Sequence, residues 1–319
     1  MQIVFLDSGS MNPGDIDFKP LSELGEFISY EQTSPYRVIE RSINADIVIT
    51  NKVKLFENEL KQLPNLKMVQ LAATGTNNVD LKYTKANKIV VCNVSGYSTP
   101  SVAQHVFSLI LAYLNQSETY FSETKSKEWC QKPGFSYWHN PILELKDKTF
   151  GVYGFGNIGR AVAKIALAFE MKVLTVNKYP ERNPVQGVTN VTEEELFKAS
   201  DFVSLHSSLN DSTFHLIDKT TLSLMKNNAV IINTGRGDLI NEEDLKDSLE
   251  QNQIGAALLD VLSEEPPQED HILLTTQNCF ITPHQAWASQ EARTRLLMGM
   301  VTNIKAFQNG EDLLSQVNL

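Results

Sequence analysis

The chain has 319 residues, of which 42% are hydrophobic and 21% are charged, and its formal net charge is −10. A globular chain of this length is expected to form about two domains, each with a substantial core. The acidic balance and the lack of a basic run argue against nucleic acid and anionic membranes as partners. No apolar run approaches membrane-spanning length and no signal peptide precedes the first strand-like residues, so we expect a cytoplasmic protein.

The three cysteines, Cys92, Cys130 and Cys279, lie far apart in the sequence. Their spacing fits neither a metal site nor a disulfide framework. We therefore expect reduced thiols, as in cytosolic proteins, and no bound metal ion.

Strand-like apolar runs alternate with helical patterns along most of the chain. This alternation predicts an α/β fold whose parallel sheets are covered by helices on both faces. In the first segment, the predicted strands are Ile3–Asp7, Ala45–Thr50, Leu66–Ala72 and Ile89–Asn93, with helical stretches at Pro20–Leu24 and Leu55–Gln62. These elements are typical of one small α/β domain.

A long helix is predicted over Ser101–Asn115, directly after Pro100. Proline is tolerated at a helix start because its missing N–H would be unpaired there in any case. Apolar residues cover much of this helix, and a helix of that kind is usually buried. We expect it to lie between domains or between subunits.

The series of predicted strands restarts at Thr149 and has six members, the number that a full dinucleotide-binding fold needs. The predicted strands are Thr149–Tyr153, Met171–Val176, Phe202–His206, Ala229–Asn233, Gly255–Val261 and Phe280–Thr282. The tail over residues 289–308 is helical and is expected to return to the first domain. The predicted organisation is a substrate domain of residues 1–99, completed by 288–319, with a dinucleotide-binding domain of residues 100–287 inserted.

Gly154, Gly156 and Gly159 fit the pattern G-x-G-x-x-G. The pattern alone is weak, but here it lies between the predicted strand 149–153 and an apolar helix over 161–169. That context is the dinucleotide-binding fingerprint. Gly154 permits the tight turn, Gly156 lets a pyrophosphate approach the backbone, and Gly159 lets the helix pack closely on the sheet.

Other groups are expected to gather at the same edge of the sheet, where ligands of such folds bind. The N–H groups of Asn157 and Ile158 would face phosphates at the positive end of the helix. Arg236, Glu265 and His284 each follow a different predicted strand of the second series. One charged loop residue is ordinary, but the three together beside a nucleotide fold favour a catalytic site.

Several segments of the chain match the motifs of a known family: 152–160, 233–237, 260–267 and 282–289. On these segments the chain resembles the D-isomer-specific 2-hydroxyacid dehydrogenases over nearly its whole length. Residues 72–80, 96–105 and 284–287 are most similar to the glycerate dehydrogenase (hydroxypyruvate reductase) branch. The resemblance implies a Rossmann-type doubly wound sheet inserted in a smaller flavodoxin-like domain. It also implies interconversion of a small 2-oxo acid and its D-2-hydroxy acid, with hydroxypyruvate and glyoxylate as expected substrates.

The resemblance implies a role for each of the three clustered residues. Arg236 would bind the substrate carboxylate and polarise the C2 carbonyl, a task that suits its planar fork better than a lysine. His284 would exchange a proton with the carbonyl oxygen, because an imidazole can do so in both directions near neutral pH. Glu265 would pair with His284 and orient its ring. The nicotinamide would supply the hydride, so the protein orients the reactants and stabilises charge.

Further contacts follow from the same resemblance. The residues implied to line the cofactor are Ser207, Thr234 and Asp260, and Asp260 would fix the nicotinamide carboxamide. The substrate carboxylate would also be held by backbone N–H groups of the loop Ala73, Thr74 and Gly75.

One position departs from the dinucleotide fingerprint. An acidic residue about 20 positions after the glycines normally binds the ribose hydroxyls of NAD. Here the strand is followed by Asn177 and Lys178, with Arg182 nearby. Asparagine would not repel a 2′-phosphate and lysine could attract one, so NADP(H) is expected to be accepted alongside NAD(H). The alternative interpretation is that Lys178 and Arg182 are solvated loop charges.

Other interpretations stay open at this point. Phosphoglycerate dehydrogenase is an alternative within enzymes, whereas Glu265 stands where formate dehydrogenases have glutamine. A nucleotide-sensing, corepressor-like binding protein is the alternative from another class. The resemblance further implies a homodimer. We assign no role to Trp138 or Trp287, and we interpret His105, within the apolar helix, as a buried structural residue.

Overall fold

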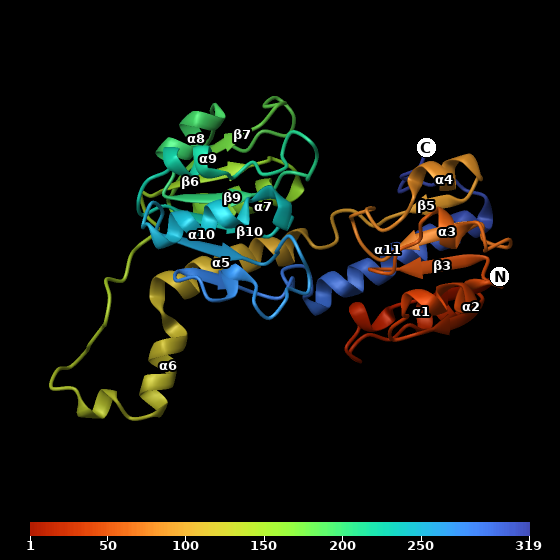
Figure 1. Ribbon diagram of the computed structural model, residues 1–319, viewed down its shortest axis with the longest axis horizontal. Helices are drawn as coiled ribbons and strands as arrows, with labels where there is room; N and C mark the ends of the chain where they lie inside the picture. Colours follow the sequence, from red (N-terminus) through yellow and green to blue (C-terminus); the bar gives the residue numbers. More distant parts are fainter. The chain divides into compact units, whose positions relative to one another are not determined.

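The computed structural model describes residues 1–319, which form two compact units. Unit 1 comprises Met1–Ser98 and Trp287–Leu319, and unit 2 comprises Thr99–Ala286. Each unit is built on one sheet, with five strands in unit 1 and seven in unit 2 (Figure 1). Neighbouring strands are parallel in both sheets, which confirms the predicted α/β fold class.

The sheet of unit 1 has the strand order β2-β1-β3-β4-β5, which is the flavodoxin-like order. Its strands are β1 (Gln2–Phe5), β2 (Glu26–Ser29), β3 (Ile47–Thr50), β4 (Met68–Leu71) and β5 (Val90–Cys92). The helices of the unit are α1 (Lys19–Ser22), α2 (Val38–Ser42), α3 (Glu57–Leu60), α4 (Leu81–Ala86) and α11 (Gln290–Asn309). Ser289 caps α11 by accepting a hydrogen bond from the N–H of Ala292.

The sheet of unit 2 has the strand order β12-β11-β10-β9-β6-β7-β8. Its strands are β6 (Thr149–Tyr153), β7 (Lys172–Val176), β8 (Val188–Asn190), β9 (Phe202–Leu205), β10 (Val230–Asn233), β11 (Ala256–Leu259) and β12 (Cys279–Ile281). Its helices are α5 (Thr99–Asn115), α6 (Ser117–Lys125), α7 (Asn157–Ala168), α8 (Glu193–Ala199), α9 (Lys219–Leu224) and α10 (Glu242–Glu250). Short 3-10 turns complete both units.

Two edge strands, β2 and β8, are absent from the strands predicted from sequence. Strand β2 is exposed or half-exposed along its length, and β8 has three residues of which two are exposed. Neither forms the continuous apolar run of a buried parallel strand, because each pairs on one side only. The continuous apolar run by which the other strands were predicted is therefore missing in both β2 and β8.

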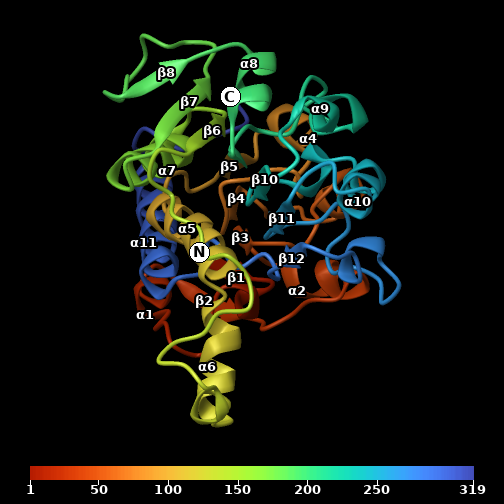
Figure 2. The same cartoon turned by 90° about the vertical axis from the view of Figure 1, so that its left-hand side faces the viewer.

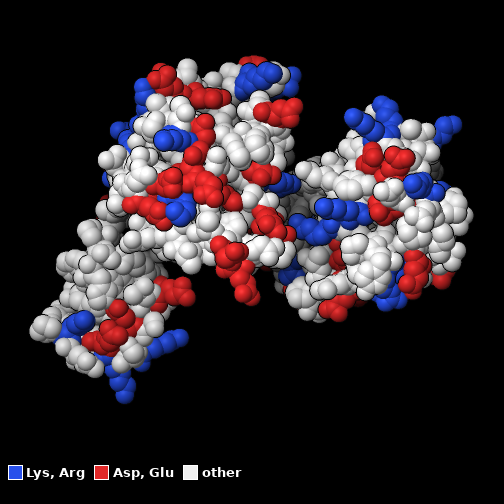
Figure 3. Space-filling view, in the orientation of Figure 1, with Lys and Arg blue, Asp and Glu red and all other residues white.

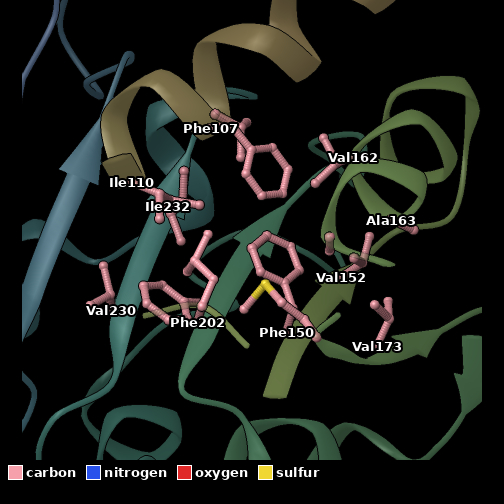
Figure 4. Close-up of a cluster of buried hydrophobic side chains, with 14 of the residues drawn as sticks. Phe107, Ile110, Phe150, Val152, Val162, Ala163, Val173, Phe202, Val230 and Ile232 are labelled. Carbon is pink, nitrogen blue, oxygen red and sulfur yellow. The ribbon is translucent and has the colours of Figure 1, made fainter. Parts of the chain in front are cut away.

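Helix α5 is buried in part by the core of unit 2. Its residues Val106, Phe107 and Ile110 pack into the core of unit 2 itself, against strand residues that include Phe150 (Figure 4). The rings of Phe107 and Phe150 stack with centroids 5.7 Å apart. Fully burying such a side chain contributes about 1.5–3 kcal/mol, so α5 is held firmly within its own unit. The burial of the helix is confirmed, and its expected position between domains or subunits stays a prediction.

The sheet of unit 2 is covered on both faces. One core contains α5 and α7, and the other contains side chains from α8, α9 and α10. Figure 2 shows α5 and α7 on one side of the strands and α9 and α10 on the other. This is the doubly wound arrangement, in which ligands bind beyond the carboxyl ends of the strands.

Candidate functional site

The turn between β6 and α7 has space for glycine alone at two positions. Gly154 has a φ of +92°, and a Cβ there would lie 2.5 Å from the backbone nitrogen of Ser207. A Cβ on Gly159 would lie 2.1 Å from the carbonyl oxygen of Gly154. Both glycines therefore allow close backbone approach, the first to the chain after β9 and the second between helix and turn.

Gly156 differs from these two glycines because a Cβ there would meet nothing within 4 Å. It is the N-cap residue of α7, and no side chain caps that end of the helix. The N–H groups of Asn157 and Ile158 start a 12-residue helix and lie at its positive end. The space over Gly156 can therefore hold part of a ligand. An anionic group is favoured there because the positive end of the helix points at it.

Two buried hydroxyls at the same edge of the sheet lack a hydrogen-bond partner in the protein. They are Oγ of Ser207, which follows β9, and Oγ1 of Thr234, which follows β10. Leaving a buried polar group unpaired costs about 1–3 kcal/mol, and a bound ligand can remove that cost by supplying the missing hydrogen bond. Together with the open backbone at Gly156, they are suited to a polar ligand.

The loop after β7 carries the residues predicted to select the cofactor. Asn177 uses its side chain locally, since its Oδ1 accepts from the N–H of Tyr179 and its Nδ2 donates to the carbonyl of Tyr179. Lys178 and Arg182 are exposed and lie over the ring of Tyr179, with cation-to-centroid distances of 5.6 and 4.5 Å. Neither forms a salt bridge. Two cations are thus available beside one aromatic face.

His284 and Glu265 form a close pair in unit 2. The Nδ1 of His284 lies 2.6 Å from Oε2 of Glu265, and Oε1 of Glu265 accepts from the N–H of Leu262 at 3.1 Å. The two side chains are 27% and 33% exposed, so the pair is open to a ligand. Because Nδ1 is engaged by the carboxylate, Nε2 is the nitrogen left for proton exchange. The backbone of His284 has a φ of +51°.

Arg236 lies in the loop after β10, and its backbone is fixed by Asn233. The Nδ2 of Asn233 donates to the carbonyl of Arg236 at 2.8 Å, and its Oδ1 accepts from the N–H of Gly235 at 3.0 Å. The guanidinium is half-buried and donates only to the carbonyl of Gly235, at 2.7 Å. No carboxylate pairs with it. A half-buried guanidinium without a protein carboxylate can bind an anionic ligand.

Asp260 is buried and its carboxylate is well occupied. Its Oδ1 accepts from the hydroxyl of Thr282 at 2.6 Å and from the N–H of Gln285 at 2.9 Å, and its Oδ2 accepts from the N–H of Ala286 at 2.8 Å. Hydrogen bonds from these groups and from His105 outweigh burial, which acts in the opposite direction, and hold the pKa of Asp260 below its usual value. The contact of Asp260 with a carboxamide stays a prediction.

In unit 1, the loop after β4 presents backbone donors. The carbonyl of Ala73 accepts from the N–H of Val94, and the carbonyl of Thr74 accepts from Nδ2 of Asn93. The N–H groups of Ala73, Thr74 and Gly75 make no hydrogen bond within the protein. A row of unpaired N–H groups is suited to bind a carboxylate.

The NAD-binding-domain model of the D-isomer-specific 2-hydroxyacid dehydrogenases matches residues 107–286 of the chain. The chain belongs to this family. It is 39% identical over 316 residues to a hydroxypyruvate reductase of Blautia hydrogenotrophica, covering 97% of this chain and 98% of that protein. It is 36% identical over 313 residues to a glycerate dehydrogenase of Methylorubrum extorquens, with 97% of each chain covered.

A solved structure gives the same result for the fold. An acyclic imino acid reductase in complex with NADPH and D-Arg superposes with a TM-score of 0.85 at 32% identity, covering 99% of this chain and 100% of that chain. As a D-2-hydroxyacid dehydrogenase, the protein is an oxidoreductase that acts on a small organic acid and uses a nicotinamide dinucleotide. None of its helices is both long and apolar enough to cross a membrane.

Three other residues of this D-2-hydroxyacid dehydrogenase complete the description of its site. Burial lowers the pKa of His206 to about 4, so this residue stays neutral, and its Nε2 bonds the hydroxyl of Ser204. Trp287 packs edge-on to Tyr97 at the core of unit 1, with ring centroids 6.3 Å apart. His105, interpreted from sequence as a buried structural residue, contacts Thr282 at 3.0 Å, two residues before His284.

The glycine turn gives a prediction that separates cofactor binding from folding. Gly156→Ala should leave the melting temperature unchanged or slightly higher, because its Cβ meets open space at an ordinary φ of −75°. The same Cβ would obstruct a pyrophosphate, and losing one charge-assisted hydrogen bond, about 1.5–3 kcal/mol, weakens cofactor binding by roughly 10- to 100-fold. Fluorescence titration with NADH and NADPH measures this.

Gly154→Ala is the matched comparison, since its Cβ would collide with the backbone after β9 at a positive φ. It should lower the melting temperature as well as the cofactor affinity. Unchanged cofactor affinity in the Gly156→Ala variant would contradict the assignment of this turn.

Proposed function

We propose that the protein reduces hydroxypyruvate or glyoxylate to the corresponding D-2-hydroxy acid or glycolate with NADH or NADPH. The observation that carries the proposal is the open His284–Glu265 pair, in the same unit as a half-buried Arg236 without a protein carboxylate. The names of the two relatives with 39% and 36% identity support the choice of substrate. The bound dinucleotide supplies the hydride, and the remaining steps belong to side chains of this chain.

Arg236 binds the anionic end of the substrate. Its planar guanidinium can make two parallel hydrogen bonds, to the carboxylate and to the C2 carbonyl oxygen of a 2-oxo acid. That arrangement fixes the orientation of the carbonyl and withdraws electron density from C2. Asn233 holds the backbone from which the guanidinium extends.

His284 supplies the proton. During reduction, Nε2 donates a proton to the C2 oxygen as negative charge develops on it, and during oxidation Nε2 takes the proton back. Glu265, at 2.6 Å from Nδ1, selects the tautomer and stabilises the positive charge of the protonated ring. In unit 1, the unpaired N–H groups of Ala73, Thr74 and Gly75 are proposed substrate contacts.

We also propose that NADPH is used as well as NADH. The cofactor loop carries Asn177 where an acidic residue would repel a 2′-phosphate, and Lys178 and Arg182 lie exposed beside Tyr179. The structural relative bound to NADPH is compatible with this proposal. Turnover with NADH and none with NADPH would contradict it.

A homodimer is proposed for the assembly. Helix α6 and the segment that follows it, residues 117–143, project from the body of unit 2 and have a largely uncharged base (Figures 1 and 3). Phe135 is 95% exposed and Trp138 is 62% exposed, and exposed aromatic rings on one segment indicate an interaction surface. In a solution of the pure protein, the partner available to this surface is a second copy of the same chain. Sedimentation velocity that finds only monomer at micromolar concentration would contradict this proposal.

The three thiols are unpaired, which supports the further proposal of a cytoplasmic location. Cell fractionation tests it, and recovery of the protein outside the cytoplasmic fraction would contradict it.

One activity panel tests the proposed function. Each of NADH and NADPH is combined with hydroxypyruvate, glyoxylate, pyruvate, phenylpyruvate and 3-phosphohydroxypyruvate, and the loss of reduced cofactor is followed. We expect the highest kcat/KM with hydroxypyruvate or glyoxylate. Preference for the phosphorylated acid would instead favour a phosphoglycerate dehydrogenase. Cofactor binding without turnover of any acid would favour a nucleotide-sensing protein.

A further inference from the structure

Residues 282–286, termed here the His284 loop, have a backbone that needs support. His284 has a φ of +51°, in the left-handed region, which costs about 1–3 kcal/mol for a residue other than glycine. Its N–H donates to the carbonyls of both Asp260 and Thr282 at 2.9 Å. A conformation of this kind persists only when surrounding groups hold it.

A chain of three side chains supplies that support. The Nε2 of His105 lies 3.0 Å from Oγ1 of Thr282 and 3.4 Å from Oδ1 of Asp260. The hydroxyl of Thr282 donates to Oδ1 of Asp260 at 2.6 Å. With that proton committed, Thr282 accepts from His105, so His105 is the donor that starts the chain. The carboxylate of Asp260 then accepts the N–H groups of the two residues that follow His284.

Helix α5 contacts the loop at a second point. The hydroxyl of Ser101 donates to the carbonyl of Ala286 at 2.6 Å. Ser101 and His105 are four residues apart, so they lie one above the other on the same face of α5. His105 contacts the first residue of the His284 loop and Ser101 contacts the last, so His284 lies between the two contacts in the sequence.

Helix α5 is a rigid support for these contacts. The neighbours of His105, Val106 and Phe107, are buried in the core of unit 2, and Phe107 stacks on Phe150. His105 itself is 15% exposed and Asp260 is 0% exposed. In a buried network of this kind, each hydrogen bond restricts its neighbours strongly. Packing in the core therefore fixes the position of His105, and the hydrogen bond from His105 to Thr282 restrains the loop.

We propose that His105 is a positioning residue for the reaction, acting on His284 through Thr282 and Asp260. The proposal rests on the proposed function of His284 as proton donor. Without the donor at His105, the loop relaxes from its positive φ and Nε2 of His284 moves out of line with the C2 oxygen. Misplacement by about 1 Å can cost 10²-fold in rate, so the network matters for kcat rather than for binding.

Two matched pairs of variants test the proposal in the full-length protein. His105→Phe keeps a ring but removes the donor, whereas His105→Gln keeps an amide donor close to the position of Nε2. Thr282→Val keeps the shape but removes the hydroxyl, whereas Thr282→Ser keeps the hydroxyl. We expect kcat to fall by about 10- to 100-fold in the Phe and Val variants, with the cofactor Kd and the KM for the 2-oxo acid unchanged. The Gln and Ser variants should regain most of the rate.

A second readout separates positioning from loss of folded protein. When the proton donor is misplaced, proton transfer limits the rate more, so the solvent deuterium isotope effect on kcat should rise in the Phe and Val variants. A merely unstable enzyme would lose kcat without any change in that isotope effect. An unchanged kcat, or a lower kcat with an unchanged isotope effect, would overturn the proposal.

A third readout does not depend on turnover. In histidine-selective NMR spectra, the Nδ1 proton that His284 shares with Glu265 should be visible in the wild-type protein and weakened in His105→Phe. An unchanged signal would overturn the positioning role even if no acid were a substrate. Failure of the activity panel with a changed signal would instead overturn the proposed function and leave the positioning role supported.

Discussion

His284→Asn is expected to lower kcat for 2-oxo acid reduction by about 10²- to 10⁴-fold, the usual contribution of a general acid. Asparagine is the suitable replacement because it tolerates the positive φ of +51° at this position better than most residues. Its amide can still donate a hydrogen bond, but it cannot transfer a proton.

Stopped-flow and steady-state kinetics measure this prediction. The control is the cofactor Kd, which should stay the same because the asparagine variant leaves the turn at Gly156 untouched. Glu265→Gln provides a graded comparison, since it keeps a hydrogen bond to Nδ1 but loses the charge. A kcat for His284→Asn within tenfold of the wild-type value would exclude His284 as the proton donor.

Arg236→Lys is expected to lower kcat/KM for the 2-oxo acid by roughly 10²- to 10⁴-fold, because it removes two hydrogen bonds to charged groups worth about 1.5–3 kcal/mol each. Lysine keeps the positive charge, so the variant tests the fork geometry rather than the charge. The guanidinium has no carboxylate partner in the protein and donates only to the carbonyl of Gly235. The melting temperature should therefore be unaffected.

Arg160→Lys is the control variant for Arg236→Lys. Arg160 also bonds a backbone carbonyl, that of Phe155, and lies on the helix that follows the glycine turn. Its replacement should change kcat/KM for the acid far less than Arg236→Lys does. Equal losses in the two variants, or a loss in Arg236→Lys that follows the melting temperature, would contradict the assignment of Arg236.

The buried part of the fold could be predicted from the sequence because buried parallel strands are continuous apolar runs. Strand β6 was predicted over the residues that form it, Thr149–Tyr153, and the long helices α5 and α11 were predicted to within about two residues. The edge strands β2 and β8 could not be predicted, since they pair on one side and their side chains are half-exposed or exposed. The burial of α5 could be predicted, but the residues that cover it could not, because apolarity shows that a helix is buried but not what packs against it.

Some residues of the candidate site could be predicted from the sequence, and others could not. The glycine turn, Arg236, Glu265 and His284 could be predicted because each follows a strand end and carries chemistry of its own. The unpaired hydroxyls of Ser207 and Thr234 became visible only in the structure, since a sequence does not show which polar groups lack partners. The link from His105 to the His284 loop was missed because the contact joins residues 177 positions apart through a buried hydroxyl.

In the proposed reaction, hydride from a nicotinamide cofactor and a proton from His284 convert a small 2-oxo acid into its D-2-hydroxy acid. The most direct measurement is the reduction of hydroxypyruvate by the wild-type protein, with the oxidised cofactor quantified by absorbance and the glycerate resolved by chiral chromatography. We expect D-glycerate in an amount equal to that of the cofactor oxidised. L-glycerate, a racemic product, or no cofactor oxidation would contradict it.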